Sequence, residues 1–412
     1  MSPTTCCRFC HTPLKHTFVD LGETPLANSY LTGEQLHLEE PTYPLHARVC
    51  NQCFLVQVDD VVPPDVIFSR YAYFSSYSTT WMNHARNFVK SAVNRFDLNS
   101  ESMVVEIASN DGYLLRNLME WQIPCLGVEP ARNVAEIAIR AGIPTEVIFF
   151  GRETAFRLAA CGNSADLIVA NNVLAHVPDL NDFVAGLKIL LKNSGVISIE
   201  CPHLLKLIEG NQFDTIYHEH FSYFSLYTLE SVFHAHGLHI FDVEELPTHG
   251  GSLRFYICHE GSERPDIATN IQKVRRAEAA AKMNTLEGYT GFIEKVKKTC
   301  WDLSQFLTQE SGKGKMVAAY GAAAKGNTLL NLCGIKTDRI PFVVDKNPTK
   351  QGCYLPGSHI LVTAPEKIFE MKPDYLLILP WNIAEEVREQ MQDIRTWGGQ
   401  FITAIPNVKV FT

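Results

Sequence analysis

Strand-like and helix-like patterns alternate over residues 103–202, and this alternation constrains the fold more than any other feature of the chain. Short apolar runs bounded by small or turn-forming residues predict five buried strands: MVVEIA, CLGVEP, TEVIFF, ADLIVANN and GVISIECP. Segments with helical periodicity lie between them, among them ARNVAEIAIRAG and DLNDFVAGLKILLK. Strands and helices that alternate at this spacing predict a parallel sheet covered by helices on both faces.

An antiparallel hairpin follows the predicted parallel sheet. The segment HIFDVEELPTHGGSLRFYICHE contains two alternating strands around a Pro-Thr-His-Gly-Gly turn. An open α/β sheet that ends in an antiparallel pair indicates the class I methyltransferase arrangement rather than a pure dinucleotide-binding fold, by analogy with known folds.

A second α/β unit is predicted near the C-terminus. Residues 264–315 are charged and helical in pattern, and they lead into a strand and helix in MVAAYGAAAKGNTLLNLCG. Later strands are predicted in IPFVVDKNP, DYLLILPW and QFITAIPNV. We therefore expect an α/β protein in three parts, divided at residues 1–68, 69–262 and 263–412.

Composition excludes several classes of function. The 412 residues are 46% hydrophobic and 20% charged, with no apolar run near the roughly 20 residues that span a bilayer. The formal net charge of −9 argues against broad nucleic-acid binding, which needs a basic surface. The first residues, MSPTTCCRFC, lack the features of a secretory signal. We expect a cytoplasmic enzyme without a membrane or nucleic-acid partner.

Two Cys-x2-Cys pairs in the first 60 residues predict a zinc site made by Cys7, Cys10, Cys50 and Cys53. Each tight turn can present two thiolates to one ion, which suits tetrahedral zinc. Four thiolates leave no open coordination position, so the metal would be structural and would contribute folding energy. Two alternatives stay open: Cys6 in place of Cys7, and four buried thiols without metal.

The segment VVEIASNDG has features of a cofactor-binding turn. Its pattern is Glu106-x-Ala108-x-Asn110-x-Gly112, and Glu129 ends the next strand, where a carboxylate can accept hydrogen bonds from ribose hydroxyls. The G-x-G-x-x-G pyrophosphate cradle is absent, which favours S-adenosylmethionine over NAD. An ordinary strand–helix turn is the alternative. The predicted cofactor-binding residues are Glu106, Ala108, Asn110, Gly112, Glu129 and Asn171.

The segment FDTIYHEHF places Tyr217, His218, Glu219 and His220 side by side. A zinc hydrolase would need H-E-x-x-H on a helix, whereas the spacing here is H-E-H. In an acid–base interpretation, a carboxylate near a histidine orients it and raises its basicity, and a tyrosine hydroxyl stabilises a developing oxyanion. A solvent-exposed turn is a third possibility, which the aromatic residues that follow disfavour.

Three further segments contribute candidate residues. The segment NNVLAH projects Asn172 and His176 toward the same crevice, although a lone histidine there can equally be structural. In YGAAAKGN, small residues before a helix predict a phosphate cradle, with close packing as the alternative. In RYAYFSSYS, aromatic and hydroxyl groups suit a sugar or nucleotide pocket, or interdomain packing. The predicted substrate-binding residues are Tyr77, Tyr320, Lys325 and Asn327.

Taken in order, these motifs give the chain a resemblance to a known family. The paired Cys-x2-Cys turns, YAYFSSYS, VEIASNDG, NNVLAH, YHEHF and YGAAAKGN resemble the deoxysugar C-methyltransferases over nearly the whole chain. The resemblance implies a class I methyltransferase-like central sheet, flanked by an N-terminal zinc-binding module and a C-terminal Rossmann-like domain. It also implies S-adenosylmethionine as cofactor and a nucleotide-linked 4-keto-6-deoxyhexose as substrate, with dTDP or GDP as the nucleotide.

The resemblance further implies roles for individual residues. His220 matches the general base that removes the C-3 proton, and Glu219 and Tyr217 stand beside it. Tyr73, His176 and Asn172 match further active-site positions. Two positions depart from the family pattern: Ala108 replaces a common glycine, and His218 replaces a residue that can be acidic. We expect a monomer. A nucleotide-sugar epimerase or oxidoreductase, and an inactive methyltransferase-like scaffold, are the alternatives.

Overall fold

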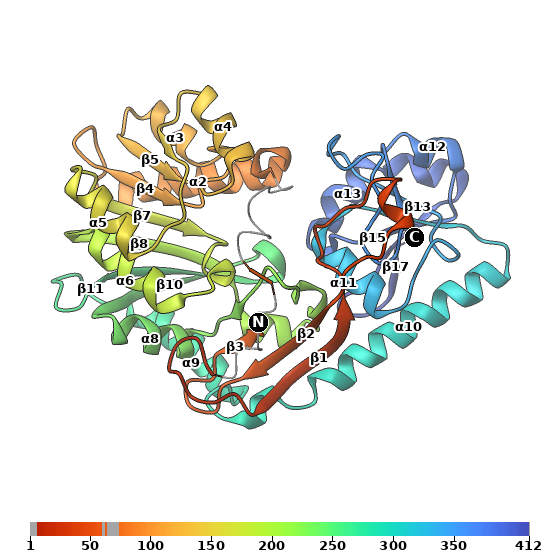
Figure 1. Cartoon of the computed structure of the whole chain (residues 1–412), viewed down its shortest axis with the longest axis horizontal. Coiled ribbons are helices and arrows are strands. Elements are labelled where there is room, and N and C mark those ends of the chain that lie inside the picture. The colour runs from red at the N-terminus through yellow and green to blue at the C-terminus, as the bar shows by residue number, and fades with distance from the viewer. Residues whose placement is uncertain (1–5, 60–61, 64–73, 412) are drawn as a thin grey trace.

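The computed structural model describes residues 6–59, 62–63 and 74–411, which form three β-sheets (Figure 1). A seven-stranded sheet and a six-stranded sheet form the two large lobes of the molecule, and a four-stranded sheet near the N-terminus lies below and between them (Figure 1). Within these described ranges, no helix combines the length and apolar character that crossing a bilayer requires.

The seven-stranded sheet has the class I methyltransferase topology, with the order β10-β11-β8-β7-β4-β5-β6. Its first five strands in the sequence pair in parallel, and β11 then inserts antiparallel between β8 and β10. The predicted parallel sheet and hairpin are confirmed, although the predicted strand TEVIFF contributes only two residues. The strands are β4 (Val104–Ile107), β5 (Cys125–Val128), β6 (Thr145–Glu146), β7 (Ala165–Asn171), β8 (Leu191–Pro202), β10 (Leu238–Leu246) and β11 (Ser252–His259).

Helices flank this sheet, and side-chain caps fix where several of them begin. Ser78, Asp179 and Ser225 each accept a hydrogen bond from a backbone N–H in the first turn of the helix that follows. The helices are α2 (Thr79–Arg95), α3 (Leu115–Glu120), α4 (Arg132–Arg140), α5 (Arg152–Ala160), α6 (Leu180–Leu190), α7 (Leu204–Glu209) and α8 (Leu226–Ala235).

The N-terminal sheet is completed by a strand from the central part of the chain. Strands β1 (His16–Thr24), β2 (Tyr43–Val49) and β3 (Val56–Val58) form an antiparallel meander. Strand β9 (Ser222–Tyr223) then pairs antiparallel with β3, with Val56 opposite Tyr223. The edge strand of the four-stranded sheet therefore begins two residues after His220.

The C-terminal sheet is Rossmann-like, with the order β14-β13-β12-β15-β16-β17 and only β17 antiparallel. The helices α9 (Ala268–Ala280) and α10 (Phe292–Gly312) lead into it, and α10 runs along the N-terminal sheet to the C-terminal lobe (Figure 1). The other elements are β12 (Val317–Tyr320), α11 (Ala324–Leu332), β13 (Phe342–Val344), β14 (Leu361–Thr363), α12 (Lys367–Met371), β15 (Tyr375–Ile378), α13 (Ala384–Gln390), β16 (Gln400–Thr403) and β17 (Lys409–Phe411).

One apolar core joins the N-terminal sheet, the C-terminal sheet and the segment that follows β8 of the central sheet. It includes Val56 of β3, Phe213 and Phe221 of the FDTIYHEHF segment, and Leu329 of α11, all of them buried. Phe18 of β1 adds a stacked contact with the first residue of α10, at 4.8 Å between ring centroids. Because these side chains lose contact with water only when the sheets meet, apolar burial holds the three parts together.

A buried ion pair anchors the central sheet where β11 joins β8. Arg254 and Glu200 are cross-strand partners, and the guanidinium lies 2.6 Å from the carboxylate, which is fully buried. His84 lies 2.8 Å from the same carboxylate oxygen, and Thr248 donates to the other oxygen. Burial raises the pKa of Glu200, but the hydrogen bond from His84 and the charge of Arg254 outweigh it and lower that pKa to about 2.

We predict that Arg254→Leu lowers the free energy of unfolding by about 3–5 kcal/mol, because it leaves a buried carboxylate without its partner. The pKa of Glu200 is lowered in the folded protein, so its contribution is present above the ordinary value of 4.5 and is lost as the pH falls toward about 2. Urea unfolding at several pH values measures both effects. Arg264→Leu is the control, because that guanidinium bonds the carbonyl of Ser194 at an exposed position. Equal midpoints for the two variants would contradict the prediction.

Candidate active site and metal site

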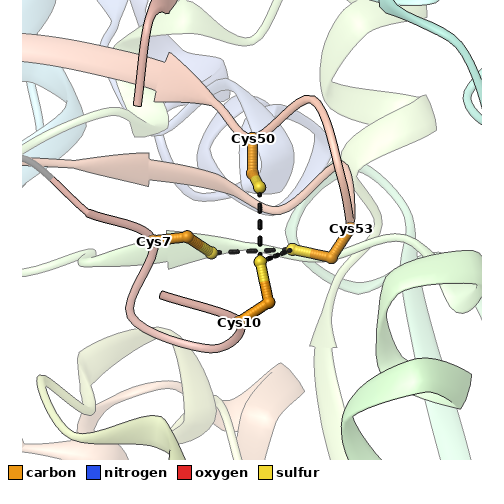
Figure 2. A group of neighbouring side chains, drawn as sticks. All are labelled: Cys7, Cys10, Cys50 and Cys53. Atoms are coloured by element: carbon orange, nitrogen blue, oxygen red, sulfur yellow. Dashed lines mark hydrogen bonds between the residues drawn. The ribbon is translucent and has the colours of Figure 1, made fainter. Parts of the chain in front are cut away.

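Cys7, Cys10, Cys50 and Cys53 converge on one point (Figure 2). Their four Sγ atoms all lie within 4.8 Å of one another, and Cys7–Cys53 and Cys10–Cys50 are each separated by 3.5 Å. A tetrahedral zinc ion with Zn–S bonds of about 2.3 Å requires Sγ atoms about 3.8 Å apart, so the group fits zinc. Cys6 lies outside this group of described residues, which decides between Cys6 and Cys7.

Two matching turns present the four thiols. The backbone N–H of His11 donates to the carbonyl of Cys7, and the N–H of Phe54 donates to the carbonyl of Cys50 in the same way. His11 and Phe54 both have the left-handed conformation, with φ of 59° and 58°. Each turn thus places its pair of thiols on one side of the chain, as zinc knuckles do.

The turn after β4 lies at the carboxyl end of the sheet and is largely buried. Ala108, Asn110 and Gly112 alternate in the left-handed conformation, with φ of 54°, 51° and 76°. Glu129 at the end of β5 accepts hydrogen bonds from the N–H groups of Asn110 and Ala131 at 3.0 and 2.8 Å. Burial raises the pKa of Glu129 to about 7, although both hydrogen bonds lower it. The Glu129 carboxylate therefore lies directly against the backbone of this turn.

Buried polar atoms without a partner surround this turn. Neither side-chain atom of Asn171, which ends β7 and is 8% exposed, has a hydrogen-bond partner among the described residues. One carboxylate oxygen of Glu106 and one of Asp111 are also buried and without a partner in this part of the chain. Such groups cost stability unless a ligand satisfies them. They fit the amino acid and nucleoside parts of S-adenosylmethionine, which are rich in donors and acceptors.

His220 is held in one tautomer. Its Nδ1 lies 2.8 Å from the carbonyl oxygen of Thr215, which can only accept, so Nδ1 carries the proton. Nε2 accepts a hydrogen bond from the hydroxyl of Tyr217, also at 2.8 Å. Burial lowers the pKa of His220 well below its ordinary value, and the nearby His176 and Lys325 lower it further. The imidazole is therefore neutral, with its lone pair on Nε2.

Other predicted residues lie around this imidazole. The ring of His176 is 4.7 Å from that of His220, and burial lowers the pKa of His176 to about 4. Asn172 donates from Nδ2 to Nε2 of His249 at 3.3 Å, while its Oδ1 is buried with no partner among the described residues. Side chains from the ends of β7 and from the turn between β10 and β11 thus meet beside His220.

Glu219 does not orient His220. Its carboxylate accepts a hydrogen bond from Asn28 at 2.6 Å, whereas the Thr215 carbonyl fixes the imidazole. The interpretation of a carboxylate-oriented histidine is therefore wrong, because consecutive side chains leave this irregular segment in different directions. His218 lies 3.2 Å from the carbonyl of Pro44 and packs against Tyr43, so it faces the N-terminal sheet rather than the site.

The C-terminal domain brings Lys325 to the same place. Lys325 donates to Asn382 at 2.9 Å and lies 4.9 Å from the ring of Trp381. Trp381 in turn donates to Asp214 of the FDTIYHEHF segment at 2.7 Å. Burial lowers the pKa of Lys325, while the charge of Asp214 opposes that shift. A cation thus lies at the junction of the two large domains.

Comparison with known proteins identifies the family. Family models match residues 7–68 as a putative zinc binding domain, 81–243 as a methyltransferase domain and 247–406 as a C-methyltransferase C-terminal domain. The C-methyltransferase NovU from Streptomyces niveus is 35% identical over 409 residues, which cover 98% of this chain and 96% of NovU. The chain belongs to the sugar C-methyltransferase family.

Membership confirms the resemblance seen in the motifs. The protein is an S-adenosylmethionine-dependent C-methyltransferase with a zinc-binding module. Two solved methyltransferase structures are each similar to less than half of this chain. The CcbJ methyltransferase from Streptomyces caelestis matches 48% of this chain and 100% of its own, at 11% identity and a TM-score of 0.37. A magnesium protoporphyrin IX methyltransferase from Synechocystis PCC 6803 matches 43% and 79%, at 12% identity and 0.34.

The remaining predicted residues of this C-methyltransferase have contacts of their own, are exposed, or lie outside the described ranges. Tyr320 is buried and its hydroxyl donates to Gln390, while Asn327 donates to the carbonyl of Ala27 at 2.6 Å. Tyr77 is 57% exposed. Tyr73 lies outside the residues that the structure describes.

Several residues at the site had no signal strong enough to predict them. His249 lies in the hairpin turn Pro-Thr-His-Gly-Gly, where it has the left-handed conformation with φ of 53°. A histidine in a turn rich in glycine was the one available cue. Asp214 lies within FDTIYHEHF, and its burial could not be read from sequence. Asn28, Lys350 and Trp381 reach the site only through contacts between distant segments.

We predict that Cys53→Ser, and the double variant Cys7→Ser/Cys53→Ser, lose bound zinc and unfold the N-terminal sheet, since binding energy of such sites is folding energy. Metal analysis and thermal unfolding measure the two effects. Cys6→Ser is the matched control, because Cys6 neighbours Cys7 but lies outside the thiol group. A double variant that stays folded and fully active without zinc would refute a structural metal.

Proposed function

We propose that this C-methyltransferase removes a proton from C-3 of a nucleotide-linked 4-keto-6-deoxyhexose and methylates that carbon, with dTDP or GDP as the nucleotide. The observation that carries this proposal is the neutral His220, whose Nε2 lone pair lies at the junction of the methyltransferase and C-terminal domains. Methylation at a carbon beside a ketone requires a base that removes a C–H proton, whereas methylation of an oxygen or nitrogen nucleophile requires no base for a carbon acid.

His220 is the base in the proposed mechanism. A 4-keto group acidifies the C-3 hydrogen, and His220 accepts this proton at Nε2 while the Thr215 carbonyl holds Nδ1–H in place. The C–H electron pair moves into the enolate, which forms the new C–C bond from C-3. S-adenosylmethionine, when bound, supplies the methyl group on a sulfonium that leaves as the neutral thioether. The Nε2 proton is later released to solvent.

Tyr217 changes partner in this mechanism. Its hydroxyl donates to Nε2 of His220 at 2.8 Å, which is where the C-3 hydrogen must approach. When the sugar enters, the hydroxyl turns to the 4-keto oxygen and donates there, which frees Nε2 and stabilises the enolate. One hydroxyl thus serves the ground state and the charged intermediate in turn.

The cofactor-binding roles of individual residues are part of the proposal. Glu129 would accept hydrogen bonds from the ribose hydroxyls, and Asn171 and Glu106 would pair their buried polar atoms with the rest of the cofactor. The left-handed turn at Ala108, Asn110 and Gly112 supports close approach of the ligand to the backbone. At Gly112 a Cβ would lie 2.3 Å from Ile143, so close packing also requires glycine there.

Substrate binding is proposed at the domain junction. In this proposal Lys325 supplies positive charge for the diphosphate, and His176 and Asn172 bind the sugar. Tyr73, which lies outside the described residues, is proposed to share that role. We also propose substrate-binding roles for Tyr77, Tyr320 and Asn327. The hydrogen bonds that Tyr320 and Asn327 make in this structure are with other residues of the protein, Gln390 and Ala27. We also propose that residues 1–68, 69–262 and 263–412 are the three functional units, and that the protein is a monomer.

The experiment that tests this function is incubation with S-adenosylmethionine and, separately, the dTDP- and GDP-linked 4-keto-6-deoxyhexoses. A gain of one methyl group in the sugar, measured by mass spectrometry, would support the proposal and identify the nucleotide. The same reaction in D₂O without S-adenosylmethionine reports exchange at C-3. If both substrates show no methylation and no exchange at C-3, the proposed reaction is overturned.

We predict that His220→Asn lowers turnover by about 10²–10⁴-fold, the usual contribution of a positioned base, while S-adenosylmethionine binding is unchanged. Steady-state kinetics and calorimetric titration measure the two quantities. His218→Asn is the matched control from the same segment, because His218 faces the N-terminal sheet. Wild-type turnover in His220→Asn would contradict the assignment of the base.

A further inference from the structure

A short segment of the zinc module lies against the C-terminal domain. Asn327 of α11 donates to the carbonyl of Ala27 at 2.6 Å, and the hydroxyl of Tyr30 donates to the carbonyl of Ala322 at 2.5 Å. Leu31 forms an antiparallel bridge with Tyr354, with hydrogen bonds of 2.9 and 2.8 Å. Three separate contacts therefore hold residues 27–31 against the C-terminal domain.

These contacts present one side chain to the acid–base segment. The amide of Asn28 donates from Nδ2 to Oε1 of Glu219 at 2.6 Å, across 191 positions of the sequence. The Glu219 side chain is 4% exposed, and the residue precedes His220 directly. The backbone of Glu219 is also a hydrogen-bond partner of His176, so the residue contacts one histidine of the site and precedes the other in the chain.

We propose that Asn28, supplied by the zinc module, is a positioning residue of the active site that favours the ionised form of the buried Glu219 carboxylate and fixes the residue that precedes His220. This inference rests on the proposed function, because it takes Glu219 as part of the acid–base site. It goes beyond that function by giving the zinc module a part in catalysis as well as in folding.

The charges around Glu219 support this role. Burial raises the pKa of Glu219 to about 7, and the Asn28 hydrogen bond and the charge of Lys350 lower it. The ammonium of Lys350 donates to the Ala322 carbonyl at 2.7 Å and lies 5.1 Å from the ring of Tyr30.

Other titratable groups nearby do not replace the Asn28 hydrogen bond. Lys350 is shared with Asp345 and Tyr30, which both raise its pKa. On the same segment as Glu219, the ring of His218 faces Pro44, and the ring of His220 is neutral and bonded to Thr215 and Tyr217. Among the described residues, Asn28 is thus the uncharged side chain that donates a hydrogen bond to this carboxylate.

The test is the pH dependence of turnover in Asn28→Leu. Without the hydrogen bond the charged form of Glu219 loses a donor, so its pKa rises and the kinetic limb that Glu219 controls moves by about one pH unit to higher pH. The limb moves to higher pH whether the reaction needs Glu219 ionised or protonated, because in both cases its midpoint follows the pKa of Glu219. Asn28→Ala gives the same comparison if the leucine variant does not accumulate.

Two controls separate this role from general damage to the fold. Ser29→Ala alters the exposed neighbour in the same segment and should leave the profile unchanged. In the Glu219→Gln background, Asn28→Leu should cause no further shift, since the group that it acts on is gone. Metal analysis of each variant shows that the zinc module is still folded. A shift that persists in Glu219→Gln would overturn the proposal.

A direct measurement distinguishes failure of this inference from failure of the proposed function. Infrared difference spectra follow protonation of the Glu219 carboxyl with pH, and Glu219→Gln identifies its band. The midpoint should move to higher pH in Asn28→Leu even if neither sugar nucleotide is methylated. An unmoved midpoint overturns the role of Asn28. A moved midpoint with an unchanged kinetic profile in an active enzyme overturns its part in catalysis.

Discussion

The segment from Phe213 to Phe224 is the constraint on which the site depends, because the N-terminal sheet and the C-terminal domain both hold it. Its last residues pair with β3 of the N-terminal sheet, and Trp381 of the C-terminal domain donates to Asp214. Thr328 of α11 donates to the carbonyl of Ile216 at 3.2 Å. With both ends and the middle fixed, the Thr215 carbonyl has one position, and it in turn fixes the tautomer of His220.

Burial at this junction shifts several ionisable groups toward their neutral forms. The pKa values of His176 and His249 fall to about 4, mainly because burial disfavours their charged forms. The same effect raises the pKa of Asp214 to about 6 and that of Glu219 to about 7. A site with few full charges and little water suits a reaction that creates an enolate, since each remaining donor acts more strongly in such surroundings.

The sequence predicted the elements whose signals are local. Alternating strand and helix patterns predicted the central sheet and its hairpin, because a buried strand is visible as a short run of consecutive apolar residues. The Cys-x2-Cys turns predicted the thiol group for the same reason, since each pair needs only four residues. The motifs around Glu106 and Asn171 were chosen as candidates because parallel strands deliver their carboxyl ends to one edge of the sheet.

Contacts between segments that are distant in the sequence could not be predicted in this way. Asn28 meets Glu219 across 191 positions, and Trp381 meets Asp214 across 167. No periodicity connects such pairs, because they depend on how whole domains pack. The direction of Glu219 was mispredicted for a related reason. In an irregular segment, neighbouring residues in sequence need not share a face, so a carboxylate beside a histidine in the chain can bond elsewhere.

The zinc site shows how a metal without catalytic chemistry can still bear on the reaction. Four thiolates would complete the coordination of zinc, so the ion has no position for substrate or water. Its effect must pass through structure. Cys53 lies just before β3, and β3 pairs with β9, which begins two residues after His220. A second route runs from the zinc module through Asn28 to Glu219. Metal binding therefore stabilises the sheet whose edge strand continues the catalytic segment. The thiols of this module pack in the core of the central sheet, and its strands pack in the core of the C-terminal sheet.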